Sequence, residues 1–200
     1  MFISHRINTI SELDSTPIEF GVEVDVRDYG DNLILSHDPF IMGESLDEFL
    51  KNYKHRFIIF NIKSERIEYK ILEKISKYKI KDYFFLDSSF PMIYNLSKAG
   101  EKNIALRFSE FESIESVLKM SGDINWIWVD CFTIFPLTKE IFDTLKERNF
   151  KICIVSPELQ NKQDEIFEYK KYMIDNGIVP DMICTKVHNI EKWENIFNYE

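Results

Sequence analysis

Residues 21–26 read GVEVDV, and this alternation restricts the class of fold that the chain can adopt. Side chains alternate between the two faces of a β-strand, so Glu23 and Asp25 share one face while three valines share the other. In a parallel sheet covered on both sides, neither face of such a strand meets bulk water. Two neighbouring carboxylates in a confined space repel each other unless a cation or a hydrogen-bond donor compensates them. The stretch therefore predicts a buried parallel strand that presents two carboxylates to a functional site.

Strand-like and helix-like stretches alternate on both sides of this segment. Short apolar, β-branched or aromatic runs indicate strands at Phe2–Ser4, Val22–Val26, Phe57–Ile62, Tyr83–Leu86, Ile104–Phe108, Trp126–Val129, Lys151–Val155 and Met182–Cys184. Amphipathic stretches between them indicate helices at Thr9–Leu13, Leu46–Tyr53, Glu65–Tyr78, Pro91–Lys98, Ile114–Met120, Lys139–Arg148, Gln163–Asn176 and Ile190–Phe197. Strands that alternate with helices in this way pair in parallel.

Eight β-then-α units in 200 residues average 25 residues each. The expected fold is α/β, a minimal (β/α)₈ TIM barrel that forms a single domain over residues 1–200. A doubly wound open sheet is the alternative, but the Gly-rich first turn of its nucleotide-binding versions is missing. The additional run Asn32–Ser36 predicts a short hairpin with the preceding strand, turned at residues 29–31.

Composition narrows the class of function. The chain has 25 basic and 34 acidic side chains, a formal charge of −9, and this balance argues against a nucleic-acid or anionic-membrane surface. No signal peptide and no apolar run as long as a membrane span are visible. Cys131, Cys153 and Cys184 lie in apolar runs without CxxC spacing, which predicts small buried side chains rather than a zinc site or disulfides. A reducing, cytoplasmic location fits this pattern.

Polar residues at the carboxyl ends of the predicted strands are the candidates for chemistry, because functional residues of such barrels gather there. His5 ends the first strand and precedes Arg6, and His37 follows the second strand. Next to Glu23 and Asp25, these two histidines are candidates for an acid/base pair. His55 and His188 have no such neighbours and are interpreted as surface residues.

The third strand adds Asn61 and Lys63, which share one face by parity. A lysine there supplies a fixed positive charge for a phosphate. Arg107 is a further candidate for phosphate binding, because it interrupts an otherwise apolar strand. The remaining polar residues expected on this rim are Asp87, Ser89, Asp130 and Glu158.

Three motifs occur in order at these positions: SHR at residues 4–6, GVEVDVR at 21–27 and LSHDP at 35–39. Together they resemble the glycerophosphodiester phosphodiesterase family, part of the phospholipase C-like phosphodiesterase barrels. The resemblance implies a phosphoric diester hydrolase of lipid metabolism, with a small-molecule phosphodiester substrate and a divalent cation, Mg²⁺ or Ca²⁺.

The resemblance also assigns roles to residues. His5 and His37 become the general acid/base pair, and Glu23 and Asp25 become ligands of the cation. Arg6 and Lys63 become phosphate-binding residues. Hard oxygen ligands suit such cations, and positive charge near the phosphate offsets its negative charge. Either water or a hydroxyl of the substrate can act as the nucleophile, giving hydrolysis or a cyclic phosphate.

The chain departs from the family at three places. The third-strand motif Glu-x-Lys reads Asn61-Ile62-Lys63 here, so Asn61 is the candidate third metal ligand through its amide oxygen. The segment after the first His-Arg is reduced to residues 7–9, and the insertion after the second histidine is missing. These departures leave nucleotide-linked and surface-polysaccharide phosphodiesters open as substrates. Asn61 also leaves open a catalytically weakened barrel that binds phosphate esters. A third alternative is an unrelated barrel enzyme, such as a phosphosugar isomerase or lyase, that uses Glu23 and Lys63 for proton transfer.

Overall fold

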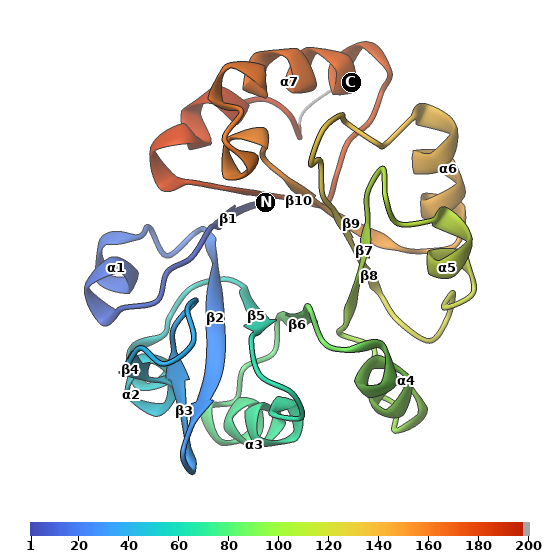
Figure 1. Cartoon of the computed structure of the whole chain (residues 1–200). Helices are drawn as coiled ribbons and strands as arrows, with labels where there is room; N and C mark the ends of the chain where they lie inside the picture. The colour runs from blue at the N-terminus through green and yellow to red at the C-terminus, as the bar shows by residue number, and fades with distance from the viewer. Residues whose placement is uncertain (198–200) are drawn as a thin grey trace. The chain divides into compact units, whose positions relative to one another are not determined.

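The computed structural model describes residues 1–197, and Figure 1 shows short strands alternating with helices along that stretch. Contacts divide the chain into two compact units. One unit is Ile3–Ala99, and the other comprises Met1–Phe2 together with the chain from Gly100 onward. Within each unit, parallel strands pair side by side and helices connect them.

Parallel strands form the sheet of the first unit. β1 (Phe2–Ser4) pairs with β2 (Gly21–Tyr29), β2 pairs with β5 (Ile58–Ile62), and β5 pairs with β6 (Tyr83–Leu86). The helices of this unit are α1 (Ile10–Ser15), α2 (Leu46–Asn52), α3 (Glu68–Tyr78) and α4 (Phe90–Lys98). Because the strands run in parallel, the residues that follow β1, β5 and β6 emerge at the same edge of the sheet.

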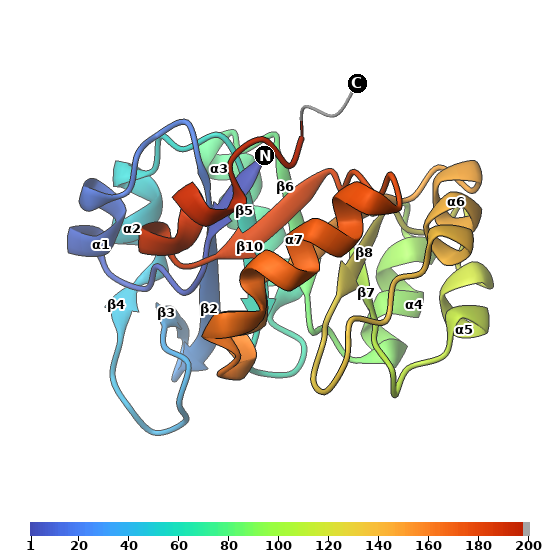
Figure 2. The same cartoon turned by 90° about the horizontal axis from the view of Figure 1, so that it is seen from above.

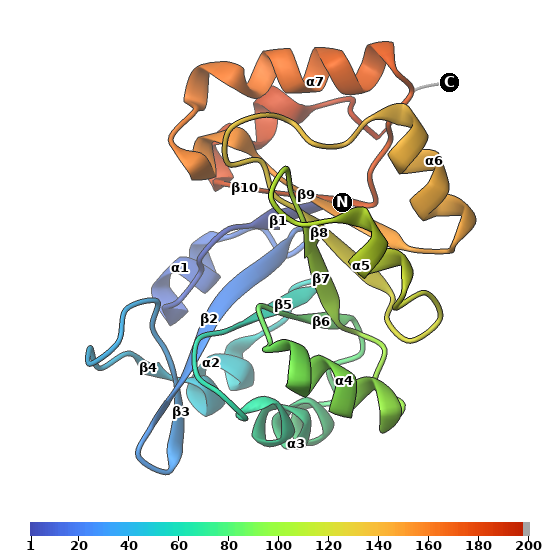
Figure 3. The same cartoon turned by 45° about the vertical axis from the view of Figure 1, so that its right-hand side comes forward.

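An antiparallel hairpin extends β2. β3 (Asn32–Leu35) pairs with the second half of β2, and the two residues of β4 (Glu44–Ser45) pair with β3. The pairing of β2 with β5 ends at Val26 opposite Ile62, whereas β2 continues to Tyr29. The hairpin therefore extends past the end of β5, as Figure 3 shows.

The second unit repeats the strand-and-helix pattern. Its paired parallel strands are β7 (Ala105–Phe108), β8 (Trp126–Val129), β9 (Lys151–Val155) and β10 (Met182–Thr185). Its helices are α5 (Ile114–Leu118), α6 (Lys139–Glu147) and α7 (Ile166–Asp175), with 3₁₀ helices η1 (Pro157–Gln160), η2 (Gln163–Glu165) and η3 (Val187–Trp193). α7 runs alongside β10 (Figures 1 and 2). The carbonyl of Met1 accepts a hydrogen bond from the Ile183 amide, so the chain start lies beside β10.

Local chemistry explains where the elements begin and what they bury. Thr9 caps α1 through a reciprocal pair of hydrogen bonds with Glu12, which satisfies amides that a helix start leaves open. In β2 the valines are buried, and Glu23 and Asp25 on the opposite face are also buried. Residues 21–26 of β2 are all buried, and Arg27 is the first residue of the strand that is partly exposed.

The sequence predictions agree with most of these elements. All eight predicted strands are present, and the hairpin turns at residues 29–31 as expected. Ile190–Phe197 was expected to be a helix, and this is wrong: the segment holds the end of the 3₁₀ helix Val187–Trp193. β4 was not expected. The three cysteines are buried, in agreement with the prediction.

His55 corrects a second expectation. It was interpreted as a surface residue, but it is 8% exposed and its Nε2 lies 2.9 Å from the carbonyl oxygen of Thr16. The imidazole ties the loop before β5 to the end of α1, a packing role that depends on distant contacts. Within the described residues, no helix is both long and apolar enough to cross a membrane.

Candidate active site

Two buried carboxylates form the centre of the site. Glu23 and Asp25 of β2 are 0% and 1% exposed, and their side chains share one face by parity. On the neighbouring strand, Asn61 of β5 lies in register with Asp25. The prediction that β2 presents both carboxylates on a buried face is confirmed.

Asn61 contacts Glu23 through its amide nitrogen. Nδ2 of Asn61 donates a hydrogen bond to Oε1 of Glu23 over 2.7 Å. The opposite amide orientation would place two oxygens against each other, so electrostatics fixes this one. Oδ1 of Asn61 is then buried and accepts no hydrogen bond within residues 1–197, and the same holds for Oδ1 of Asp25.

The end of β1 brings His5 and Arg6 to the two carboxylates. Nε2 of His5 lies 3.8 Å from Oε2 of Glu23, and the backbone amide of Arg6 donates to the same oxygen over 2.6 Å. Nε of Arg6 lies 3.4 Å from Oδ2 of Asp25. Arg6 has a backbone φ of 56°, a left-handed conformation that costs a non-glycine residue about 1 kcal/mol. The strain is offset by contacts that this one residue makes with both carboxylates.

Asn8 was missed by the sequence analysis. Its Nδ2 donates to Oδ2 of Asp25 over 2.8 Å, and its Oδ1 accepts from the Asp25 backbone amide over 2.8 Å. The paired bonds fix the side-chain position of Asp25 from the loop after β1. Asn8 lies in the shortened segment after the His-Arg pair. The sequence feature that could have drawn attention to it is its position directly before Thr9, the N-cap of α1.

Lys63 closes the cluster from the end of β5. Its Nζ lies 3.6 Å from Oδ1 of Asp25 and 3.5 Å from Oδ2 of Asp87. Asp87 follows β6 with a φ of 59°. Lys63 and Arg6 therefore place two positive charges around Asp25, and phosphate binding by these two residues stays a prediction.

His37 lies beside this cluster through its backbone. The amide of Ser36 donates to the carbonyl oxygen of Asp25, and the guanidinium of Arg27 donates to the carbonyl oxygens of both His37 and Lys63. The imidazole itself is half-exposed, and its Nδ1 lies 2.7 Å from Oδ1 of Asp38. No hydrogen bond or ion pair among the described residues links this imidazole to Glu23 or Asp25. Because Nδ1 of His37 is paired with Asp38, Nε2 is the ring atom left for proton transfer.

Burial controls the protonation of Glu23. Burial, and then the charge of Asp25, raise the pKa of Glu23 above its ordinary value. The hydrogen bonds from Asn61 and Arg6 act in the opposite direction but do not compensate. Burial therefore disfavours the ionised form of Glu23, and a further positive charge nearby would favour it.

The donor set fits a hard divalent cation. Oδ1 of Asp25 and Oδ1 of Asn61 are buried oxygens without hydrogen bonds, they come from register partners, and Glu23 adds a second carboxylate. No group of three or more His, Cys, Asp or Glu side chains in the described stretch could hold a metal ion. The amide oxygen of Asn61 is a further donor of the hard type that such cations prefer, and its role as a metal ligand stays a prediction.

Arg107 belongs to the second unit. Its Nη1 donates a hydrogen bond to Oδ2 of Asp130, and its Nε lies 3.9 Å from Oε1 of Glu112. Its predicted contact with phosphate stays a prediction.

Solved structures share this fold. A protein from Galdieria sulphuraria that is assigned to the glycerophosphodiester phosphodiesterases has a TM-score of 0.73 and 15% identity, over 98% of this chain and 97% of its own. A glycerophosphodiester phosphodiesterase from Agrobacterium tumefaciens has a TM-score of 0.68 and 13% identity, over 98% and 97%. An Oleispira antarctica phosphodiesterase, solved with its product sn-glycerol-3-phosphate, has a TM-score of 0.65 and 14% identity, over 100% and 97%.

These likenesses show that the chain has the α/β fold of these structures, and they support the family resemblance drawn from the motifs. No protein-family model matches the sequence, and no curated protein matches it either.

Proposed function

We propose that the chain is a phosphodiester hydrolase similar to the glycerophosphodiester phosphodiesterases. The observation that carries the proposal is the convergence of His5, Arg6, Asn61 and Lys63 on the Glu23–Asp25 pair. Two further facts support it. The motif residues that suggested the family occupy adjacent strand ends, and structures of the same fold are named as phosphodiesterases, one of them with bound sn-glycerol-3-phosphate.

In this proposal the phosphate is held by positive charge. Arg6 and Lys63 flank Asp25 and offer a guanidinium and an ammonium to the phosphoryl oxygens. Arg107 is the third proposed phosphate contact. The strained backbone of Arg6 positions its guanidinium before substrate arrives, so little ordering is required on binding.

Proton transfer is assigned to the two histidines. His5 faces Glu23, which would stabilise a protonated imidazole during the reaction. Asp38 contacts Nδ1 of His37, so Nε2, on the other side of the ring, is the atom that would transfer the proton. One imidazole removes the proton of the attacking water or substrate hydroxyl, and the other protonates the departing oxygen.

Glu23, Asp25 and Asn61 would hold a divalent cation, Mg²⁺ or Ca²⁺. When bound, such a cation neutralises charge on the phosphoryl oxygens. We further propose that all eight strands close into the single-domain (β/α)₈ barrel expected from the sequence, a proposal supported by solved structures that match 98–100% of the chain.

A second candidate function is a phosphate-ester-binding protein with weakened turnover. The observation that favours it is the hydrogen bond from Asn61 to Glu23, which stands where the family's motif has a third carboxylate. In that case the binding cations, Arg6 and Lys63, remain while the cation site has lost one negative charge.

Release of p-nitrophenol from bis(p-nitrophenyl) phosphate tests the proposal. We expect turnover that EDTA abolishes and that added Mg²⁺ or Ca²⁺ restores. No turnover with any added divalent cation, together with tight binding of a phosphate ester, would establish the second candidate instead.

A further inference from the structure

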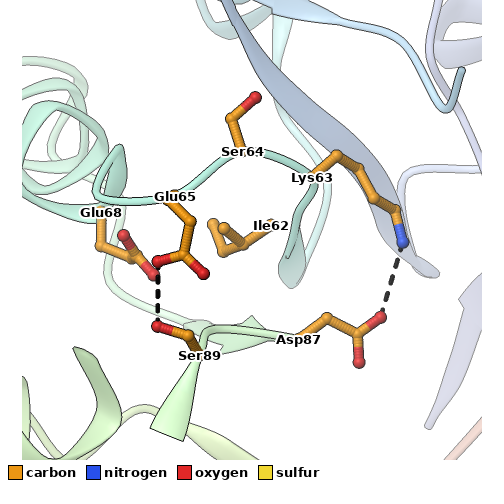
Figure 4. Close-up of a pocket in the computed structure, with 7 residues that line it drawn as sticks. All are labelled: Ile62, Lys63, Ser64, Glu65, Glu68, Asp87 and Ser89. Atoms are coloured by element: carbon orange, nitrogen blue, oxygen red, sulfur yellow. Dashed lines mark hydrogen bonds and ion pairs between the residues drawn. The ribbon is translucent and has the colours of Figure 1, made fainter. Parts of the chain in front are cut away.

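A pocket of about 280 Å³ adjoins the candidate active site within the first unit. Figure 4 shows the side chains that surround it, which come from the end of β5, the start of α3 and the loop after β6. Its polar lining consists of Lys63, Ser64, Glu65, Glu68, Asp87 and Ser89. Because Lys63 also contacts Asp25, the pocket begins one side chain away from the proposed phosphate position.

The pocket is negatively charged. It has three carboxylates, on Glu65, Glu68 and Asp87, whereas Lys63 is its one cation among the described lining residues. In Figure 4 Glu65 and Glu68 lie on the opposite side of the pocket from Lys63 and Asp87. The ion pairs of the Lys63 ammonium are with Asp25 and Asp87.

Glu68 is the most informative of these residues. It is 1% exposed, and its Oε2 is buried without a hydrogen bond from any described residue. Its position in the first turn of α3 gives partial compensation from the helix dipole. A buried carboxylate oxygen with no donor still costs free energy, which a ligand that carries N–H groups would recover.

The chemistry of the lining selects the kind of cation. No group of three or more metal-ligating carboxylates, cysteines or histidines forms in the described stretch, so the carboxylates do not converge on a metal ion. The volume is also several times the roughly 30 Å³ that one water molecule occupies. A quaternary ammonium favours aromatic walls, and none of the described residues that line this pocket is aromatic. A primary ammonium fits, since it can donate to Glu68 and Glu65 and to the hydroxyl oxygens of Ser64 and Ser89.

We propose that this pocket binds the primary ammonium group of an amino alcohol esterified to the substrate phosphate. The inference rests on the proposed function for the phosphate position, and it narrows the substrate class to phosphodiesters with one short, cationic alcohol group. Lys63 connects the two parts of the site, because its ammonium lies between Asp25 and Asp87.

Calorimetric titration with O-phosphoethanolamine and with propyl phosphate tests the proposal. The two probes have similar size and differ in an ammonium against a methyl group. We expect O-phosphoethanolamine to bind about tenfold more tightly or better, the effect of one hydrogen bond to a charged group. Glu68→Gln, which keeps the side-chain shape, should reduce that ratio to near one, and Glu65→Gln should reduce it partly.

Glu73→Gln is the matched control, because Glu73 is an exposed residue of the same helix that does not line this pocket. The ratio should be unchanged in this variant. Equal affinity of the wild type for both probes would overturn the proposal, and so would a preference that survives in Glu68→Gln.

The outcome is separable from that of the proposed function. A protein that hydrolyses bis(p-nitrophenyl) phosphate but binds both probes equally retains the phosphodiesterase proposal and loses the ammonium pocket. A protein that prefers O-phosphoethanolamine but hydrolyses no phosphodiester retains the ammonium pocket and loses the phosphodiesterase proposal. A stronger affinity for Mg²⁺ in wild type than in Glu68→Gln, without an ammonium preference, would replace the organic cation by a metal ion and overturn the proposal.

Discussion

Buried carboxylates in the two units differ in how completely their oxygens are satisfied. Glu158 in the second unit accepts hydrogen bonds from the hydroxyls of Ser156 and Thr185 and from the amide of Lys186. Asp25 in the first unit keeps one buried oxygen without a hydrogen bond. Both residues were expected on the rim of the site, yet one is saturated by neutral donors and the other is not.

The difference separates structural carboxylates from ligand-binding ones. A carboxylate whose oxygens all accept hydrogen bonds from the protein stabilises the fold and gains little from a ligand. A buried carboxylate oxygen that accepts no hydrogen bond can still gain from a ligand, and this holds for Oδ1 of Asp25, which has the Lys63 ammonium 3.6 Å away but no hydrogen-bond donor. By this criterion we propose ligand-binding roles for Asp25 and Glu68, whereas Glu158 supports the segment after β9.

The histidines give the largest expected effect. His5→Ala and His37→Ala should each lower kcat/KM for a dialkyl phosphodiester by about 10²–10⁴-fold, the range for loss of a general acid or base. A dialkyl substrate is required because its alcohol, unlike p-nitrophenol, must be protonated as it leaves. His188→Ala, an exposed histidine of the second unit, is the control and should retain full activity. Near-normal hydrolysis by either active-site variant would remove that histidine from the mechanism.

Metal affinity should respond to charge at Asn61. Calorimetric titration of the wild type should show weak binding of Mg²⁺ or Ca²⁺ that tightens when a phosphodiester analogue supplies a further anionic oxygen. Asn61→Glu should raise the affinity of the free protein by about tenfold, because it adds one negative charge to the donor set.

Tight binding by the free wild type, with no gain in the variant, would show that Asn61 is not at the cation. Asp87 would then be the first residue to test as the third ligand.

Stability should separate the saturated carboxylate from the open one. Glu158→Gln should lower the free energy of unfolding by about 2 kcal/mol, since its amide cannot accept all the hydrogen bonds that the carboxylate accepts. Glu68→Gln should leave this free energy unchanged or raise it by about 1 kcal/mol, because it removes a buried carboxylate whose Oε2 accepts no hydrogen bond from the described residues. Urea denaturation measures both. Equal destabilisation by the two substitutions would contradict the distinction between them.

Asp47 gives the smallest effect and a pH dependence. Burial disfavours its ionised form, but hydrogen bonds from Lys74, Lys77 and Tyr78 outweigh burial and lower its pKa below the ordinary value of 3.8. Because the folded-state pKa is the lower one, the stabilisation is complete well above 3.8 and is lost as pH falls below it. Asp47→Asn should therefore cost about 1 kcal/mol at neutral pH, and the difference from wild type should shrink in acid. A difference that is constant with pH would exclude this ion-pair network as its cause.

The fold and the centre of the site follow from local patterns. Strand parity alone places Glu23 beside Asp25 and Asn61 beside Lys63, and parallel pairing brings the ends of β1, β2 and β5 to one edge. The strands follow equally simple rules, because short β-branched and aromatic runs have few other ways to be buried.

Features that depend on loop conformation could not be predicted. Asn8 contacts Asp25 from a loop in which Arg6 has a left-handed backbone, and arginine has no preference for that conformation that would predict it. The open oxygen of Glu68 depends on how α3 begins, and Glu68 has the same sequence pattern as any acidic residue in a first helical turn. The burial of His55 comes from a contact with Thr16, far away in sequence.

Paired substitutions of the two kinds of carboxylate test the central claim most directly. Initial rates with bis(p-nitrophenyl) phosphate would be measured for Asp25→Asn and Glu158→Gln, each normalised to the folded fraction found by urea denaturation. We expect Asp25→Asn to remain folded and lose at least about a hundredfold in rate, the scale of losing one electrostatic contact to the transition state. Glu158→Gln should lose stability and keep its rate per folded molecule. A fully active Asp25→Asn protein would contradict the assignment of the Glu23–Asp25 cluster as a phosphodiesterase site.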